Sequence, residues 1–172
     1  MIFAHVAVVR SIKSVMGSKI KQFDKTLRPR GAVGVYVLNK KNQLLLLLRN
    51  SSHQGGMWCA PGGHIEYGES FEDTAIREAK EECGINVKKI AFLNATSDVY
   101  DSEKKHYIGI HLKAVAYTGI PKLTEPDNFF EIKWFDLNNL PTNLLPGNKH
   151  FFEQNPMCLC GSGKKHTSCH GK

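Results

Sequence analysis

Residues 62–85 read GGHIEYGESFEDTAIREAKEECGI and are the most informative stretch of the chain. Seven carboxylates lie within it: Glu66, Glu69, Glu72, Asp73, Glu78, Glu81 and Glu82. Like charges at this density repel one another, and a solvated helix mixes its charges more evenly. The stretch therefore predicts a site at which a positively charged group or ion neutralises the carboxylates.

A single helix is expected inside this stretch. Ser70, with Asp73 three places on, forms a plausible capping box, so the helix should begin at Phe71. Gly84 should end it. At about 100° per residue, one apolar stripe results, made of Phe71, Ala75, Ile76, Ala79 and Cys83.

The carboxylates of this helix are placed for binding a cation. Glu78 and Glu82 fall along one edge of the apolar stripe, and Glu81 lies slightly further round. Three carboxylates this close raise one another's pKa unless a cation cancels their charge. Mg²⁺ suits such oxygen ligands together with substrate phosphates, and can polarise a phosphoryl oxygen. Arg77 can reach Glu81 at i+4 and orient it.

The stretch resembles the signature of the Nudix hydrolases, G-x5-E-x7-R-E-U-x-E-E-x-G-U with U aliphatic, without a gap. The nine defined positions are filled by Gly63, Glu69, Arg77, Glu78, Ala79, Glu81, Glu82, Gly84 and Ile85. The resemblance implies an α/β fold, an α/β/α sandwich with a mixed β-sheet. It also implies Mg²⁺- or Mn²⁺-dependent hydrolysis of a nucleoside diphosphate linked to another group.

The resemblance also implies roles for individual residues. Glu78 and Glu82 would be the core Mg²⁺ ligands and Glu81 a third, with the Gly63 carbonyl and Glu69 close to the metal. Gly62 and Gly63 would lie against the substrate, and Arg77 would support the catalytic carboxylates. The general base differs within the family; Glu78 and Glu131 are both candidates.

The rest of the chain is consistent with one α/β domain. Valines alternate in GAVGVYVL (31–38), QLLLLL (43–48) follows a turn, and a β-hairpin is expected there. Three more strand-like runs follow, at 90–100, 106–117 and 129–137. A short closing helix broken by Pro146 and Gly147 is expected near 140–154. We therefore expect an N-terminal extension over 1–27, a Nudix domain over 28–155 and a tail over 156–172.

The net charge of +7 does not belong to the domain body. Residues 1–30 carry +6, residues 31–156 carry −2, and residues 157–172 carry +3. Because the basic residues lie at the two ends and the domain body is mildly acidic, the charge pattern disfavours a nucleic-acid partner. No apolar run approaches the roughly 18 residues needed to span a bilayer, so no membrane partner is expected.

Sequence outside the signature resembles the MutT-type nucleoside triphosphate diphosphatases over about residues 28–140. That subgroup converts an NTP or dNTP to the monophosphate and pyrophosphate. ADP-ribose hydrolases usually carry a proline where this chain has Tyr100. Nucleotide-sugar or dinucleotide hydrolysis, and a nucleotide sensor without hydrolysis, remain the alternatives. A monomer or homodimer is compatible with the resemblance.

Five aromatic or imidazole side chains lie at positions where pocket and core roles both have to be considered. Tyr100 could stack on a base or be a half-buried strand residue, and Trp58 is expected in the core. His106 and His111 are expected to share one strand face, and His64 could meet phosphate or lie on a surface loop.

The last fifteen residues carry a separate signal. Cys158, Cys160, Cys169 and His170 form C-x-C-x8-C-H, a spacing that suits a closed tetrahedral Zn²⁺ site. Reactive thiols or a disulfide are the alternative. The tail resembles the SEC-C motif, which implies structural Zn²⁺ and contact with a protein partner. Cys59 and Cys83 are expected as buried thiols, and free thiols beside a thiolate site favour a cytoplasmic location.

Overall fold

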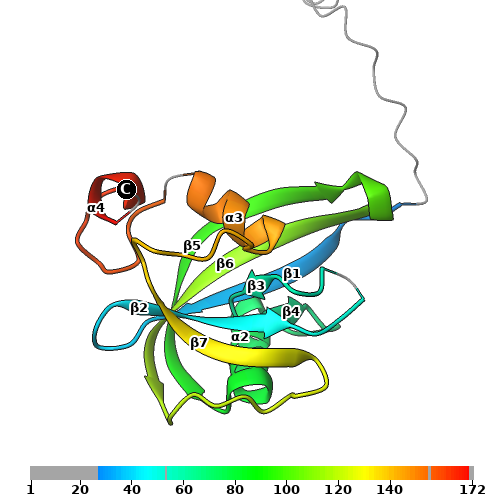
Figure 1. Cartoon of the computed structure of the whole chain (residues 1–172). Helices are drawn as coiled ribbons and strands as arrows, with labels where there is room; N and C mark the ends of the chain where they lie inside the picture. The colour runs from blue at the N-terminus through cyan, green and yellow to red at the C-terminus, as the bar shows by residue number, and fades with distance from the viewer. Residues whose placement is uncertain (1–26, 53, 155, 171–172) are drawn as a thin grey trace, which may run out of the picture.

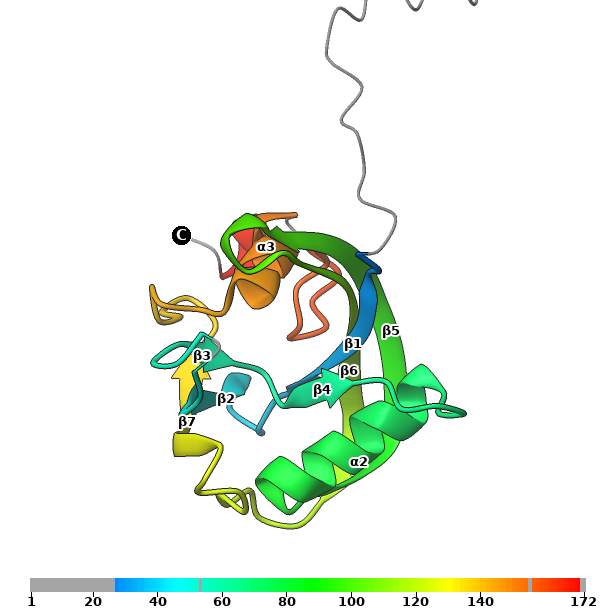
Figure 2. The same cartoon turned by 90° about the vertical axis from the view of Figure 1, so that its right-hand side faces the viewer.

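The computed structural model describes residues 27–52, 54–154 and 156–170. Nearly all of the expected N-terminal extension therefore lies outside the described residues. The described chain contains both strands and helices, with four strands before the first helix, and forms the mixed α/β fold that the sequence predicts. The elements form layers, with α2 (Phe71–Cys83) on one side of the strands and α3 (Pro146–Glu153) on the other (Figures 1 and 2).

The strands form two sheets. The first has the order β4-β1-β6-β5 and contains β1 (Arg30–Val37), β4 (Gly62–His64), β5 (Asn86–Tyr100) and β6 (Lys105–Thr118). β1 runs parallel to β6 and antiparallel to β4, so this sheet is mixed as predicted. The second has the order β3-β2-β7 and contains β3 (Trp58–Cys59), β2 (Gln43–Arg49) and β7 (Phe129–Asp136), all antiparallel.

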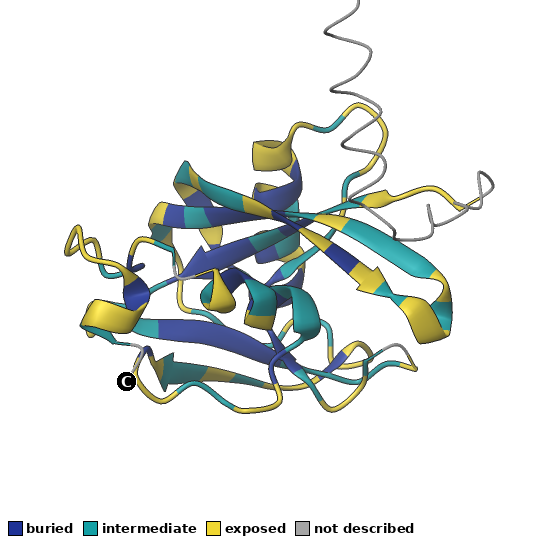
Figure 3. Ribbon diagram, turned by 90° about the horizontal axis from the view of Figure 1, so that it is seen from above, coloured by how far each residue is buried: buried dark blue, intermediate teal, exposed yellow. Residues whose placement is uncertain are grey.

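Two hydrophobic cores lie on opposite faces of β1 and β2. Val35 and Leu47 face the core shared with α2, whereas Tyr36 and Leu46 face the core shared with α3. Because both faces are covered, QLLLLL can be apolar without alternation. Buried residues gather on the central strands and the inner sides of the helices, and exposed residues on the peripheral loops (Figure 3).

The expected hairpin of β1 and β2 is wrong. The two strands belong to different sheets and touch only through an isolated bridge between Leu38 and Leu44. β1 already pairs with β4 on one edge and β6 on the other, which leaves no edge for β2. The turn at Asn39–Gln43 joins two sheets instead of two neighbouring strands.

Helix α2 begins and ends where the sequence predicts. The Ser70 hydroxyl accepts from the Asp73 backbone N–H, and the Asp73 carboxylate accepts from the Ser70 backbone N–H. Gly84 caps the C-terminus with φ of 67°, in the left-handed region that glycine adopts without strain.

The predicted apolar stripe of α2 is only partly right. Ala75, Ala79 and Cys83 are fully buried, but Phe71 and Ile76 are 44% and 41% exposed. The buried face is turned toward Thr74 and Glu82 instead. This rotation carries Glu82 into the interior, against β4.

The prediction that Pro146 and Gly147 break the closing helix is wrong, because both residues belong to α3. Pro146 occupies the first turn of the helix, where its missing N–H costs nothing, and Gly147 lies inside it. A short helix α4 (His166–Cys169) follows in the tail, and a 3-10 turn (Asp101–Glu103) joins β5 to β6. Within the described ranges, none of the helices has the length and apolar character to cross a membrane.

The capping box can be tested directly. Ser70→Ala should lower the free energy of unfolding by about 1 kcal/mol, because the Asp73 N–H loses its acceptor. Ser70→Asn, which restores a capping oxygen, should stay close to wild type. Urea unfolding of the three proteins measures this, and equal midpoints for Ser70→Ala and wild type would contradict it.

Candidate functional site

The acidic edge of α2 meets the backbone of β4. The Gly62 N–H donates to Glu82 Oε2 at 2.8 Å, and Glu78 Oε1 lies 2.1 Å from where a Cβ on Gly63 would stand. A Cβ on Gly62 would lie 2.0 Å from the Val33 carbonyl oxygen. Only a glycine pair lets the strand approach both β1 and the two carboxylates this closely.

Arg77 organises the carboxylates around it. Its Nε and Nη2 donate to the two oxygens of Glu69 at 2.7 and 3.0 Å. Nη1 donates to Glu78 at 2.8 Å and to Glu81 at 3.1 Å, as the i+4 spacing predicts. Nη2 also donates to the His64 carbonyl, which ties the loop after β4 to the helix.

The pKa values of these acids diverge because their surroundings differ. The Arg77 guanidinium, helped by the Glu66 N–H and Thr74, lowers the pKa of Glu69 to about 2. Burial raises the pKa of Glu78 despite Arg77, and raises that of Glu82 well above its usual range. Glu82 is 5% exposed, so its charge needs a compensating cation.

Glu69 is placed differently from Glu78 and Glu82. Both of its oxygens bind Arg77, and one also accepts from the Thr74 hydroxyl and the Glu66 N–H. Glu69 therefore fixes Arg77, which in turn fixes Glu78. Three of its four hydrogen bonds converge on Oε2, and Oε1 accepts from Arg77 Nε.

The structure separates Glu131 from this group. Glu131 is exposed on β7 opposite Leu48, and alternates with Ile132, which packs on the α2 side. It therefore lies on the other face of its strand. Glu125, before β7, is the additional acid that interacts electrostatically with Glu78 and Glu82. Sequence reasoning missed Glu125 because it lies in a loop 43 residues beyond Glu82.

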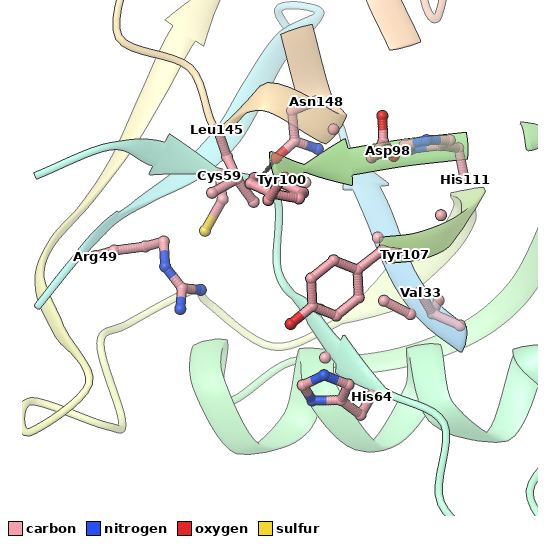
Figure 4. A pocket seen from close by; sticks show the side chains of 17 residues that line it. Val33, Arg49, Cys59, His64, Asp98, Tyr100, Tyr107, His111, Leu145 and Asn148 are labelled. Atoms are coloured by element: carbon pink, nitrogen blue, oxygen red, sulfur yellow. Dashed lines mark hydrogen bonds between the residues drawn. The ribbon is translucent and has the colours of Figure 1, made fainter. Parts of the chain in front are cut away.

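A pocket of about 150 Å³ adjoins the glycine pair. It lies between the first sheet, β3 and the start of α3, and Figure 4 shows Asn148 and Asp98 on one side, His64 on another and Tyr107 between them. Tyr100 lines the pocket as one of the two predicted possibilities allows, and meets Tyr107 edge-on at 5.7 Å.

Other imidazole and aromatic predictions have mixed outcomes. His64 lines the pocket, with its ring 5.6 Å from that of Tyr107. Trp58 is buried against Phe135, as expected. His106 and His111 do not share a face, because they are five positions apart and side chains on a strand alternate between its two faces. His111 points inward, while His106 contacts exposed Ser97.

Several pocket residues were missed from sequence, Tyr107 among them. Arg49 ends β2 after five leucines and brings a positive charge to the pocket. Asp98 alternates with Tyr100 along β5, a period-two signal that places both on the pocket face. Asn148 enters from the first turn of α3, a contact that no local pattern reveals.

The tail brings its four predicted ligands together. One ligand atom from each of Cys158, Cys160, Cys169 and His170 lies within 4.8 Å of the others. Cys160 and Cys169 sulfurs are 3.6 Å apart, and Cys158 Sγ is 3.1 Å from His170 Nδ1. A tetrahedral ion with metal–sulfur bonds of about 2.3 Å places its sulfurs about 3.8 Å apart, so these spacings fit a metal site.

Within the described residues this is the one group of three or more such side chains that converges so closely. The carboxylates of α2 are spread more widely, because Arg77 and Gly62 hold them. All five cysteines are free thiols. Hydrogen bonds from Ser162 lower the pKa of Cys160 to about 7, which favours the thiolate that metals bind.

A family profile described as the NUDIX domain matches residues 28–154. The chain is 33% identical over 131 residues to an ADP-ribose pyrophosphatase of Methanocaldococcus jannaschii, covering 76% of each protein. It is 34% identical over 115 residues to a putative 8-oxo-dGTP diphosphatase of Bacillus subtilis, covering 67% of this chain and 72% of the relative.

A third relative is longer. The NAD-capped RNA hydrolase NudC of Pseudomonas putida is 30% identical over 113 residues, and the match spans 66% of this chain but 39% of that protein. Among solved structures, a MutT NUDIX hydrolase from Burkholderia pseudomallei superposes with a TM-score of 0.70 at 28% identity. That match covers 74% of this chain and 98% of the other.

The profile match covers most of the chain, and the signature residues that it contains converge around Arg77 and the glycine pair. The fold, the sequence match and the position of the acids agree. The chain belongs to the Nudix hydrolase family.

Proposed function

We propose that this Nudix hydrolase cleaves an NTP or dNTP to the monophosphate and pyrophosphate in a Mg²⁺- or Mn²⁺-dependent reaction. The observation that carries the proposal is the placement of half-buried Glu78 and buried Glu82 against Gly62–Gly63, beside a pocket with aromatic and polar walls. Similarity to the putative 8-oxo-dGTP diphosphatase and the MutT structure supports the substrate class.

Carboxylates with raised pKa values are a suitable donor set for a hard divalent ion. Glu78 and Glu82 would hold it, with Glu81 as a third ligand and the Gly63 carbonyl close by. Once bound, the ion would polarise the phosphate chain and stabilise the charge that develops at the reacting phosphorus. Glu69 supports these residues through Arg77.

Other side chains of the protein would bind the substrate and accept a proton. Arg49 brings a positive charge to the pocket for the substrate phosphates, and Tyr100 and Tyr107 offer aromatic surface to a base. Glu78 is the better placed candidate to take a proton from the attacking water, since Glu131 faces away. In the metal-free protein, burial raises the pKa of Glu78.

ADP-ribose hydrolysis is the second candidate, because the Methanocaldococcus jannaschii relative is named an ADP-ribose pyrophosphatase. The proline expected for that activity is absent, and Tyr100 takes its place.

We also propose that the tail holds structural Zn²⁺, and that the protein, with its free thiols, belongs in the reducing cytoplasm.

The first test is turnover on a panel of the common NTPs, dNTPs and ADP-ribose with Mg²⁺, scored by monophosphate and pyrophosphate release. Glu82→Gln should lower kcat by about two to three orders of magnitude, because a buried ligand for the ion is lost. Glu72→Gln, at an exposed position of the same helix, should retain wild-type rates. Undiminished kcat in Glu82→Gln at saturating Mg²⁺ would reject the assignment.

The pH dependence of stability gives an independent test. Because folding raises the pKa of Glu78 and Glu82, these two carboxyls hold more protons in the folded protein than in the unfolded chain. Without Mg²⁺, they should therefore lower Tm, relative to Glu82→Gln, as pH rises above the ordinary glutamate pKa, while the lowered pKa of His111 contributes equally to both proteins. The increase in Tm on adding Mg²⁺ should grow over the same range.

Glu82→Gln should flatten both the fall in Tm and the Mg²⁺ increment, because its side chain cannot ionise. Thermal unfolding from pH 5 to pH 8 with and without Mg²⁺ measures both. A Mg²⁺ increment in the variant equal to that of the wild type would place the ion elsewhere.

The tail is tested by metal analysis. A reduced sample should contain one Zn²⁺ per chain, and Cys169→Ser should lose it because the closed site needs four protein ligands. Cys83→Ala, which removes a thiol far from the tail set, should keep it. A zinc-to-chain ratio near zero in the wild type would show that the tail holds no zinc.

A further inference from the structure

The cysteine-containing tail is part of the domain's own interior. Cys158 and Leu159 are 5% and 2% exposed, and share a core with Tyr36, Leu46 and Phe151. A motif serving only an external partner would have no need to bury its apolar residue in the domain. The tail therefore covers one of the two cores.

Two further contacts seat the tail. Lys113 Nζ on β6 donates to the Leu159 carbonyl at 2.6 Å. The buried His166 ring lies 5.0 Å from the ring of Phe152 on α3. The tail thus contacts both the strand and the helix that border the pocket, at positions further along each of them than the residues that line the pocket.

Helix α3 lies between the tail and the pocket. Its first turn supplies Gly147 and Asn148 to the pocket wall, and its last turn supplies Phe151 and Phe152 to the core under the tail. Eight residues at about 1.5 Å each span only about 12 Å, so the helix responds to its packing as one rigid body.

A buried chain of hydrogen bonds extends this connection. Burial lowers the pKa of His111 to about 4, so its ring is neutral, with one nitrogen accepting and the other donating. Asn148 Nδ2 donates to the Tyr36 hydroxyl at 3.0 Å, which donates to His111 Nδ1 at 3.1 Å.

The same chain continues to the pocket wall. His111 Nε2 donates to the Thr96 hydroxyl at 2.9 Å, which donates to Asp98 Oδ2 at 2.7 Å. The other Asp98 oxygen meets His150 of α3 at 2.8 Å. Both ends of the chain, Asn148 and Asp98, are therefore held by α3 and line the pocket.

We propose that the metal-bound tail is a positioning element for the nucleotide pocket: by packing against the last turn of α3 it holds Asn148 and Asp98 in place for substrate. Leu159 is the main positioning residue, since it joins the tail to the core beneath α3. This inference rests on the proposed zinc site and the proposed nucleotide hydrolysis. Helix α2, which carries the carboxylates, packs on the other core through Ala75, Ala79 and Cys83, so their chemistry should not depend on the tail.

The proposal predicts a change in substrate binding with little change in the chemical step. Leu159→Ala, which keeps all four metal ligands, should raise KM about tenfold or more while kcat stays within about twofold. Cys160→Ser, which removes a ligand, should do the same and lose zinc. Leu159→Met should restore most of the wild-type KM, and the exposed variant Lys165→Ala should match wild type.

The experiment uses the full chain, with dGTP and ADP-ribose as probes and assays well below Tm. ¹⁵N NMR of His111 supplies a readout that does not depend on turnover. The wild type should show one protonated nitrogen, Nε2, and Leu159→Ala should shift or broaden both nitrogen signals. Lys165→Ala should leave them unchanged.

Unchanged KM and an unchanged His111 spectrum in Leu159→Ala would overturn the proposal, as would a fall in kcat at constant KM. If Cys160→Ser does not fold, Leu159→Ala alone decides the outcome. Failure of the wild type to hydrolyse either probe, or any nucleotide of the panel, would instead count against the proposed function. In that case the His111 spectra still decide whether the tail positions the pocket.

Discussion

The approach of the β4 backbone to the acidic edge of α2 is the constraint on which the rest of the structure depends. Gly62 and Gly63 have no side chains, so the strand can lie against Val33 on one side and against Glu78 and Glu82 on the other. This contact draws two carboxylates into a region of low dielectric and raises their pKa values. Burying the two carboxylates costs stability unless a cation compensates their charge.

Arg77 makes that arrangement specific. Without it, Glu69, Glu78 and Glu81 would repel one another and separate into solvent. Its planar donors instead fix all three acids and the loop after β4 in one geometry. Glu69, Glu78 and Glu81 thus share Arg77, whereas Glu82 is held separately by the Gly62 N–H.

Local patterns predicted local features well. The capping box at Ser70, the stop at Gly84 and the contact between Arg77 and Glu81 depend on residues a few positions apart, and the structure has them. The signature likewise predicted the family. The cysteine and histidine spacing of the tail predicted a convergence of ligand atoms that the structure has.

What the sequence could not provide depends on contacts between distant segments. The pairing of β1 with β6 removes the expected hairpin, and the entry of α3 places Asn148 beside Asp98, fifty residues earlier in the chain. The rotation of α2 that exposes Phe71 and buries Glu82 is likewise decided by β4, not by the helix itself. His106 and His111 were misjudged for a simpler reason, since an odd spacing reverses the strand face.

The two cores also divide the sulfur chemistry of the molecule. Cys59 and Cys83 are enclosed by apolar neighbours that raise their pKa values, that of Cys59 to about 12, so they stay protonated and inert. Cys160 has the opposite character, because Ser162 stabilises its thiolate. An alkylating reagent or oxidant would therefore attack the tail before the body, and occupancy by a metal would decide how long the tail resists.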